Sequence, residues 1–170
     1  VQILLNNLLY DFAQVTIPTD NVDDDYVAEP KRWDIGFIKR FMIVFGPISS
    51  LYDVLTYLVM LYVFHADAAL FQTGWFVESL ATQTLVIHVI RSRHSIRKSR
   101  ASLALTLSSL GVVAIGSAIP YTPIGRFFGF VPLPAAFFAV LIAMTAAYLA
   151  MVNAVKRVFY KKGGVWGAGI

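Results

Sequence analysis

Asn7 and Asp11 stand four residues apart in an opening segment, residues 1–17, that is otherwise almost wholly apolar. Residues at positions i and i+4 share one face of an α-helix. A carboxylate in a membrane helix costs roughly 2.5–3.5 kcal/mol on insertion scales, so it needs a partner, a water-lined cavity or a cation. The pair is therefore a candidate ion site, with Gln14 one turn further along.

The oxygen atoms of Asn7 and Asp11 are hard ligands, which suit magnesium or calcium better than copper or zinc. One amide and one carboxylate leave room for retained waters, and magnesium gives up its water reluctantly. This chemistry favours magnesium. The alternative is that Asn7 bonds a neighbouring helix and that Asp11 pairs with a Lys or Arg from a helix outside this sequence.

The composition is that of a membrane protein. Hydrophobic residues make up 58% of the chain and charged residues 14%, against about 45–50% and 25% in a soluble domain. The chain has no cysteine, which excludes disulfides and thiolate metal sites. The net charge of +4 could indicate nucleic acid. However, the basic residues lie beside apolar segments, as membrane topology requires, so we expect no nucleic-acid partner.

Five apolar segments predict an all-α membrane protein with five transmembrane helices, at residues 1–17, 41–64, 75–90, 102–121 and 133–155. The connections are residues 18–40, 65–74, 91–101 and 122–132, and a tail follows at 156–170. The first segment is short for a bilayer crossing, which takes about 20 residues. Because the chain also begins at Val1, we expect a piece of a longer protein. Segment 75–90 is short and polar, and we expect it to extend back to Phe71 or to pack inside the bundle.

The placement of Lys and Arg predicts the orientation. Thirteen of the fourteen basic residues fall in residues 18–40, 91–101 and 156–170, and Arg126 is the exception. The positive-inside rule makes these three regions cytoplasmic. The N-terminal end would then lie outside and the C-terminus inside. Loop 18–40 carries an acidic run around Asp23, which is either a solvated turn that caps the following helix or a functional element, namely a cytoplasmic contact surface or an entry site for cations.

Four polar residues inside the other segments could also matter. Asp53 lies near mid-span and should face the bundle, either as a buried partner of another polar side chain or as a ligand or relay. Gln83 is a candidate for a bundle-facing hydrogen bond. Glu78 lies near the outer boundary and is expected to be a solvated rim residue. His88 is expected to be a packing residue. The last two segments carry small residues and no carboxylate, which is typical of scaffold helices.

Signatures of soluble enzymes are missing from the sequence. We find no phosphate-binding glycine loop, no metal-binding His pair and no Ser or Cys nucleophile motif. We therefore predict no catalytic and no cofactor-binding residue, and we expect that this chain alone catalyses nothing.

The run Asn7-Leu8-Leu9-Tyr10-Asp11 resembles the sixth membrane helix of P-type cation pumps. Its continuation through Asp23, together with three further blocks in the same order, is similar to the magnesium-importing P-type ATPases of bacteria. The further blocks are Arg40-Phe41-Met42 with Phe45-Gly46-Pro47-Ile48-Ser49-Ser50 and Asp53, then Phe71-Gln72-Thr73-Gly74-Trp75-Phe76-Val77-Glu78 with Gln83-Thr84-Leu85 and His88-Val89-Ile90-Arg91, and Ser99-Arg100-Ala101-Ser102.

The resemblance implies that the five segments are membrane helices six to ten, the C-terminal half of the pump's transmembrane domain. It implies ATP-driven magnesium uptake across the bacterial inner membrane, with Mg²⁺ as the transported ion and as the companion of ATP in the parent protein. Asn7 and Asp11 would supply part of the ion site, and Tyr10 occupies the intervening position. The expected partners are the bilayer and the missing part of the same pump, namely helices one to five and the cytoplasmic domains.

Two other interpretations stay open. The chain could be a non-catalytic membrane scaffold or subunit, whose buried polar residues only hold helices together. It could also belong to a P-type pump for another divalent cation, such as calcium or nickel.

Overall fold

The computed structural model describes residues 1–21, 35–92 and 99–166, with side chains as far as Tyr160. Within these ranges the chain forms helices and no strand. The acidic run at 23–25 and the basic residues at 31, 32, 93, 97 and 98 lie outside the described residues, as do the side chains at 161 and 162. The loop predictions that depend on them therefore also lie outside.

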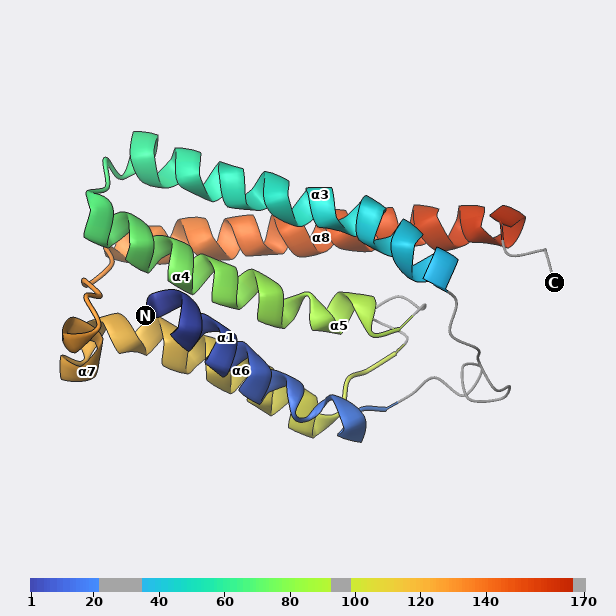
Figure 1. Ribbon diagram of the computed structural model, residues 1–170, viewed down its shortest axis with the longest axis horizontal. Coiled ribbons are helices and arrows are strands. Elements are labelled where there is room, and N and C mark those ends of the chain that lie inside the picture. The colour runs from blue at the N-terminus through green and yellow to red at the C-terminus, as the bar shows by residue number, and fades with distance from the viewer. Residues whose placement is uncertain (22–34, 93–98, 167–170) are drawn as a thin grey trace.

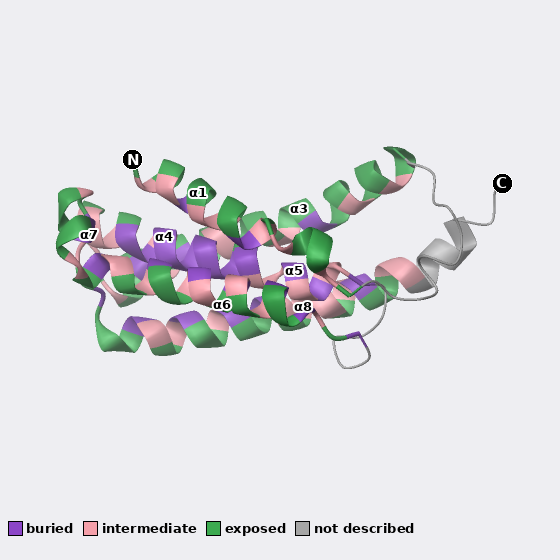
Figure 2. Ribbon diagram, turned by 90° about the horizontal axis from the view of Figure 1, so that it is seen from below, coloured by how far each residue is buried: buried purple, intermediate pink, exposed green. Residues whose placement is uncertain are grey.

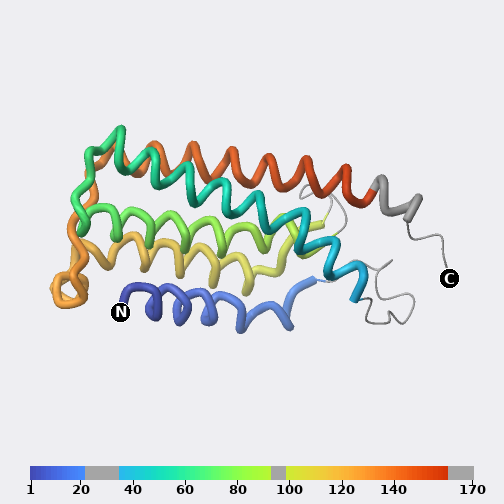
Figure 3. Tube along the Cα trace, turned by 45° about the horizontal axis from the view of Figure 1, so that its top comes forward, coloured from blue at the N-terminus to red at the C-terminus, as the bar shows by residue number. Residues whose placement is uncertain are grey.

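The long helices of the described residues, which are five in number, run side by side (Figure 1). In chain order the elements are α1 (Gln2–Gln14), the 3-10 turn η1 (Ile17–Thr19), α3 (Ile35–Leu58), the π-helical turn η2 (Val59–Val63), α4 (Ala68–Leu85), α5 (Ile87–Ile90), α6 (Leu103–Ala118), the 3-10 turn η3 (Ile119–Tyr121), α7 (Pro123–Phe127) and α8 (Ala135–Trp166). The start of α1 lies at the same end of the bundle as the α3–α4 connection and α7. The red end of the coloured part of α8 lies at the opposite end (Figure 3).

Side-chain caps fix where three of these helices begin. Each capping oxygen accepts a hydrogen bond from an amide three residues later. The bonds are Leu70 N to Asp67 Oδ1 at 2.8 Å, Leu105 N to Ser102 Oγ at 3.1 Å and Gly125 N to Thr122 Oγ1 at 3.0 Å. The cap at Asp67 starts α4 at Ala68, inside the stretch expected to be an outer loop and well before Trp75.

α4 lies in the middle of the bundle and contacts α1, α3, α6 and α8. Most of its residues from Thr73 to Thr84 are buried (Figure 2). A helix surrounded by other helices can carry polar side chains without exposing them to lipid. This explains why segment 75–90 is the most polar of the five, and it confirms that the segment packs inside the bundle.

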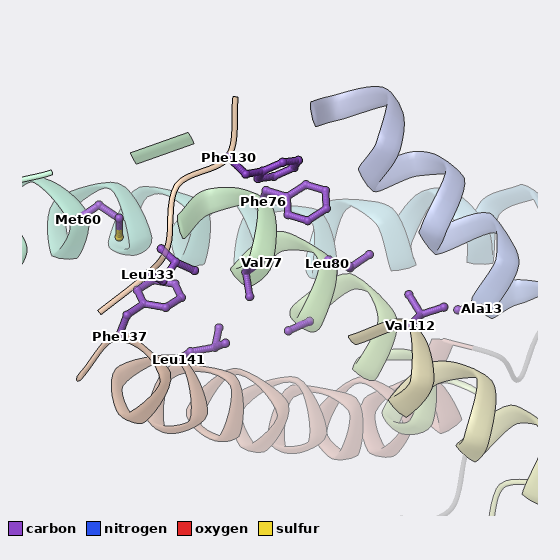
Figure 4. Packing of buried hydrophobic residues seen from close by; sticks show 11 residues of the cluster. Ala13, Met60, Phe76, Val77, Leu80, Val112, Phe130, Leu133, Phe137 and Leu141 are labelled. Atoms are coloured by element: carbon purple, nitrogen blue, oxygen red, sulfur yellow. The ribbon is translucent and has the colours of Figure 1, made fainter. Parts of the chain in front are cut away.

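The larger of two buried apolar clusters joins α1, η2, α4, α6 and α8 (Figure 4). At its centre Phe76 of α4 meets Phe130 from the α7–α8 connection, with ring centroids 4.7 Å apart in an edge-on arrangement. The smaller cluster joins α3, α5 and α8 through Phe45, Val89, Tyr148 and Val152. Only the larger cluster includes residues of α1, and it packs one side of this helix against the bundle.

Among the described residues, three helical stretches are long and apolar enough to cross a membrane: Ile35–Val63, Leu103–Tyr121 and Ala135–Tyr160. They correspond to three of the five predicted spans. α1 and α4 are not among them, so their spans stay a prediction.

A buried lysine ties α8 to the end of α5. Lys156 is 1% exposed, and its ammonium donates hydrogen bonds to the carbonyls of Val89, at 2.7 Å, and Ser92, at 3.1 Å. Carbonyls at the end of a helix lack partners within that helix and attract cations. α8 therefore remains helical past Val155, where the cytoplasmic tail was expected to begin, and packs there against α5.

Gly125 provides a test of the α7 packing. A Cβ at this position would collide with the carbonyl oxygen of Ile119 and would lie 2.8 Å from its carbonyl carbon. Backbone atoms cannot move aside as a side chain can, so we expect Gly125→Ala to cost about 1–3 kcal/mol of stability. The matched control is Gly111→Ala, because a Cβ there would meet nothing within 4 Å. Thermal unfolding of the full-length protein in detergent should show a lower melting temperature for the first variant only. Equal melting temperatures would contradict this packing.

Candidate ion site

Asn7 and Asp11 lie on one face of α1, because the helix is regular from Gln2 to Gln14. Both side chains are exposed on the surface of this chain. Among the described residues, neither side chain forms a hydrogen bond or an ion pair. In particular, no basic side chain of the described residues neutralises Asp11. The face that carries the two residues is therefore available to groups outside this chain.

The buried face of α1 is turned away from this pair and carries Asn6 and Ala13. The Asn6 amide, 2% exposed, donates a hydrogen bond of 3.3 Å to the carbonyl of Phe76 on α4. Its own side-chain oxygen accepts no hydrogen bond among the described residues. Asn6 thus has the helix-bonding role that the sequence left open for Asn7.

The two accessory residues of α1 lie between these faces. Tyr10 is partly buried and packs against the larger apolar cluster. Gln14 is partly exposed, one turn beyond Asp11 toward the end of the helix. The positions of Tyr10 and Gln14 do not exclude either residue from an ion site, and both stay candidates.

A second polar location lies between α3, α4 and α8. It is a cavity of about 40 Å³, lined by Ser49, Tyr52, Asp53, Glu78, Thr82, Gln83 and Tyr148. One water needs roughly 10–15 Å³ of such space, so the cavity can hold a small number of waters. Ser49 and Tyr148 are joined across it by a hydrogen bond of 2.9 Å between their hydroxyls. Asp53 therefore faces the bundle, as its position in the sequence predicts.

Glu78 is the most deeply buried carboxyl of this cavity, with 2% of the residue exposed. Neither of its carboxyl oxygens has a hydrogen-bond partner among the described residues. The expectation of a solvated rim residue was wrong. Because α4 begins at Ala68, Glu78 lies in the middle of this helix and is surrounded by its neighbours. A buried carboxyl without a donor must hold a proton, bind a cation or bond to water.

Gln83 forms a side-chain hydrogen bond within its own helix, and His88 forms one to a neighbouring helix. The Gln83 amide donates to the hydroxyl of Ser79, at 2.7 Å, and its side chain borders the cavity while the residue as a whole is exposed. His88 Nε2 lies 2.7 Å from the hydroxyl of Ser109 and so links α5 to α6. His88 is thus a satisfied packing residue, as predicted.

The arrangement provides oxygen ligands in two locations and a complete ion cage in neither. Among the described residues, no group of three or more His, Asp or Glu side chains could hold a metal ion. Any cation at Asn7 and Asp11 would need further ligands from outside the described residues. The sequence alone did not indicate that Asn6 bonds a neighbouring helix or that Glu78 is buried. Asp67, however, is a residue type that often caps a helix, and it could have indicated the early start of α4.

Comparison with known proteins gives concordant matches. Residues 1–158 match the family described as cation transporting ATPase, C-terminus. The chain is 41% identical over 169 residues to the magnesium-transporting ATPase, P-type 1, of Escherichia coli (strain K12), which covers 96% of the chain. It is 39% identical over 171 residues to the protein of the same name from Salmonella typhimurium (strain LT2), which covers 98% of the chain. In both cases the chain spans 19% of the length of the relative.

Proposed function

Since the chain belongs to the cation-transporting ATPases, of which it forms the C-terminal region, we propose that it is the last membrane section of a pump that imports magnesium. Its role is to supply part of the membrane ion site and the helices that hold that part in place. The observation that carries this proposal is the pair Asn7 and Asp11, exposed on α1 without side-chain partners in the part of the chain that the structure describes.

The surroundings of this pair support a missing protein partner. The outer face of α1 is otherwise apolar, with exposed Val1, Ile3, Leu4, Leu8, Phe12 and Val15. An acid on such a face would be costly against lipid. Preceding membrane helices of the same pump would cover this face and complete the oxygen cage around a hard cation such as Mg²⁺. The share of 19% of each relative is consistent with a large preceding part.

We also propose that all five long helices cross the membrane. α1 and α4 lie alongside α6, which is itself long and apolar enough to cross. α4 together with α5 covers Ala68–Ile90, and at 1.5 Å per residue this length reaches across roughly 30 Å of hydrocarbon. Its polarity is explained by contacts with protein on every side. The basic loops would lie in the cytoplasm of a bacterium and the start of α1 outside the inner membrane.

A metal titration of the full-length pump in liposomes tests the choice of ion. The concentration of the Mg²⁺–ATP complex is held constant while free Mg²⁺, Ca²⁺ or Ni²⁺ is varied, so that the nucleotide requirement does not confound the result. The liposomes enclose the ATP, so that only pumps whose cytoplasmic side faces the lumen are energised. We expect free Mg²⁺ alone to stimulate ATP hydrolysis and to enter these liposomes, as a Mg²⁺-sensitive dye would report.

Two other results would decide against the proposal in different ways. Equal or greater stimulation by Ca²⁺ or Ni²⁺ would assign the region to a pump for another cation. Hydrolysis that depends on no free metal at all would favour a scaffold role, in which Asn6 and the other buried polar residues merely hold helices together.

A further inference from the structure

Arg91, the residue directly after α5, forms a buried ion pair with Asp20, which follows η1. The Arg91 Nε donates to Asp20 Oδ2, and the two side chains are only 7% and 11% exposed. The residues are 71 positions apart in the sequence. The pair therefore joins the loop behind α1 to the end of α5.

The other nitrogens of the guanidinium are also used. Nη1 donates to the carbonyl of Ser99, at 3.2 Å, and to its hydroxyl, at 3.0 Å. Nη2 donates to the carbonyls of Asn21, at 2.6 Å, and Arg100, at 3.2 Å. Only the flat, forked guanidinium reaches so many acceptors at once. We call this set, Asp20, Asn21, Arg91, Ser99 and Arg100, the Arg91 clamp.

The carboxylate of Asp20 extends the clamp to α6. Its Oδ1 accepts a hydrogen bond of 2.8 Å from the amide of Ser102, the cap of that helix. Burial alone would raise the pKa of Asp20, but the hydrogen bonds from Arg91 and Ser102 outweigh burial and lower it below its ordinary value. The contribution of the ion pair to stability is therefore present above the pKa of the unfolded chain and is lost only as the pH falls through the folded value.

α1 is held to α6 a second time, one turn closer to the candidate ion site. The Thr16 and Ser108 hydroxyls are 2.7 Å apart, and the Ser108 hydroxyl donates to the carbonyl of Ala13, at 3.3 Å. Asp11 precedes Thr16 by little more than a turn of helix. The clamp and this contact together fix how far α1 is shifted along its axis, and how it is rotated, relative to α5 and α6.

We propose that Asp20 and Arg91 are positioning residues for the transported cation, which act by holding α1, and with it Asn7 and Asp11, at the correct height and rotation. This inference rests on the proposed function. Neither residue touches the ion in this proposal. Without the clamp, Asn7 and Asp11 would shift relative to the ion ligands from the rest of the pump. The affinity for the ion would then fall.

A double-mutant cycle in the full-length pump tests the clamp. The variants are Asp20→Asn, Arg91→Gln and the two combined, with Arg126→Gln as the matched control, since that arginine is exposed and does not belong to the clamp. The readouts are the free Mg²⁺ concentration at half-maximal ATP hydrolysis, the maximal rate and the melting temperature. We expect each single variant to raise the half-maximal concentration roughly tenfold, as for residues that support ion ligands, with a maximal rate close to wild type.

The double variant should be less impaired than the sum of the two single variants, because both remove the shared ion pair, and the control should match wild type. Lower melting temperatures with an unchanged half-maximal concentration would reduce the clamp to a purely structural role and overturn the proposal, and so would additive effects. If the neutral variants do not accumulate, Arg91→Lys replaces them. Arg91→Lys keeps the positive charge but lacks the forked donors of the guanidinium. If this variant folds and its half-maximal free Mg²⁺ concentration equals that of wild type, the proposal is likewise overturned.

The Asp11→Asn variant separates this proposal from the one on which it rests. If Asp11→Asn abolishes stimulation by Mg²⁺ and the clamp variants leave the half-maximal concentration unchanged, only the clamp proposal fails. If Asp11→Asn behaves as wild type, the ion site itself fails.

Discussion

Asp11→Asn in the full-length pump is expected to abolish Mg²⁺-stimulated ATP hydrolysis and to leave the amount and melting temperature of the protein close to wild type. The substitution keeps the shape of the side chain and removes one negative charge. Loss of a residue that merely supports a metal ligand costs 10–100-fold in affinity or activity, so loss of a ligand itself should cost roughly 100-fold or more. Stability should change by about 0.5 kcal/mol or less within this chain, because the Asp11 side chain is exposed and has no described partner.

The matched control for Asp11 is Asn6→Leu on the opposite face of the same helix. It removes the hydrogen bond to the carbonyl of Phe76 and leaves that buried acceptor without its partner. We expect this variant to lower the melting temperature without changing the dependence on free Mg²⁺. A normal response to Mg²⁺ in Asp11→Asn would remove Asp11 from the ion site, and it would favour the scaffold interpretation if the melting temperature fell instead.

Glu78→Gln is the second variant for which we expect a large effect. If Glu78 binds a cation or exchanges a proton during transport, an uncharged amide of the same shape should lower Mg²⁺-stimulated turnover by roughly tenfold or more. The melting temperature should be unchanged or higher, because a buried ionisable group without a partner destabilises a protein. Loss of turnover together with preserved stability would distinguish a functional carboxyl from a structural one.

Ser49→Ala is the control for Glu78, since Ser49 borders the same cavity but carries no charge. It loses only the hydrogen bond to Tyr148, so its turnover should stay near wild type. Asp53→Asn would then report whether the two carboxyls of the cavity act together. Wild-type turnover in Glu78→Gln would show that the cavity is structural.

A helix lies within or around each of the five apolar segments, so the approximate place of these helices along the chain was predictable from the lengths of the apolar segments. The sidedness inferred from the basic loops stays a prediction. The start of α4 was predicted too far along the chain. Apolar content pointed to Trp75, whereas the cap at Asp67 sets the first turn at Ala68. That difference moved Glu78 from the expected rim to the interior.

The rotation of α1 was harder to predict from the sequence. Apolar residues occur on all sides of this helix, so their spacing does not reveal which side is buried. The structure buries Asn6 and leaves Asn7 exposed. The shared face of Asn7 and Asp11 follows from their spacing alone, but its direction depends on contacts with α4 and α6. The Arg91 clamp was beyond prediction for a similar reason, because its members come from loops that only the folded bundle brings together.

The central position of α4 has a consequence for how such a protein is made. A segment that carries Glu78, Thr82 and Thr84 inserts unfavourably into lipid as long as no other helix covers these side chains. α6 and α8, two of the helices that shield it, are synthesised later. If α4 crosses the bilayer as we propose, its stable residence there awaits these later partners, and membrane insertion of this segment is then a result of assembly and not a step that precedes it.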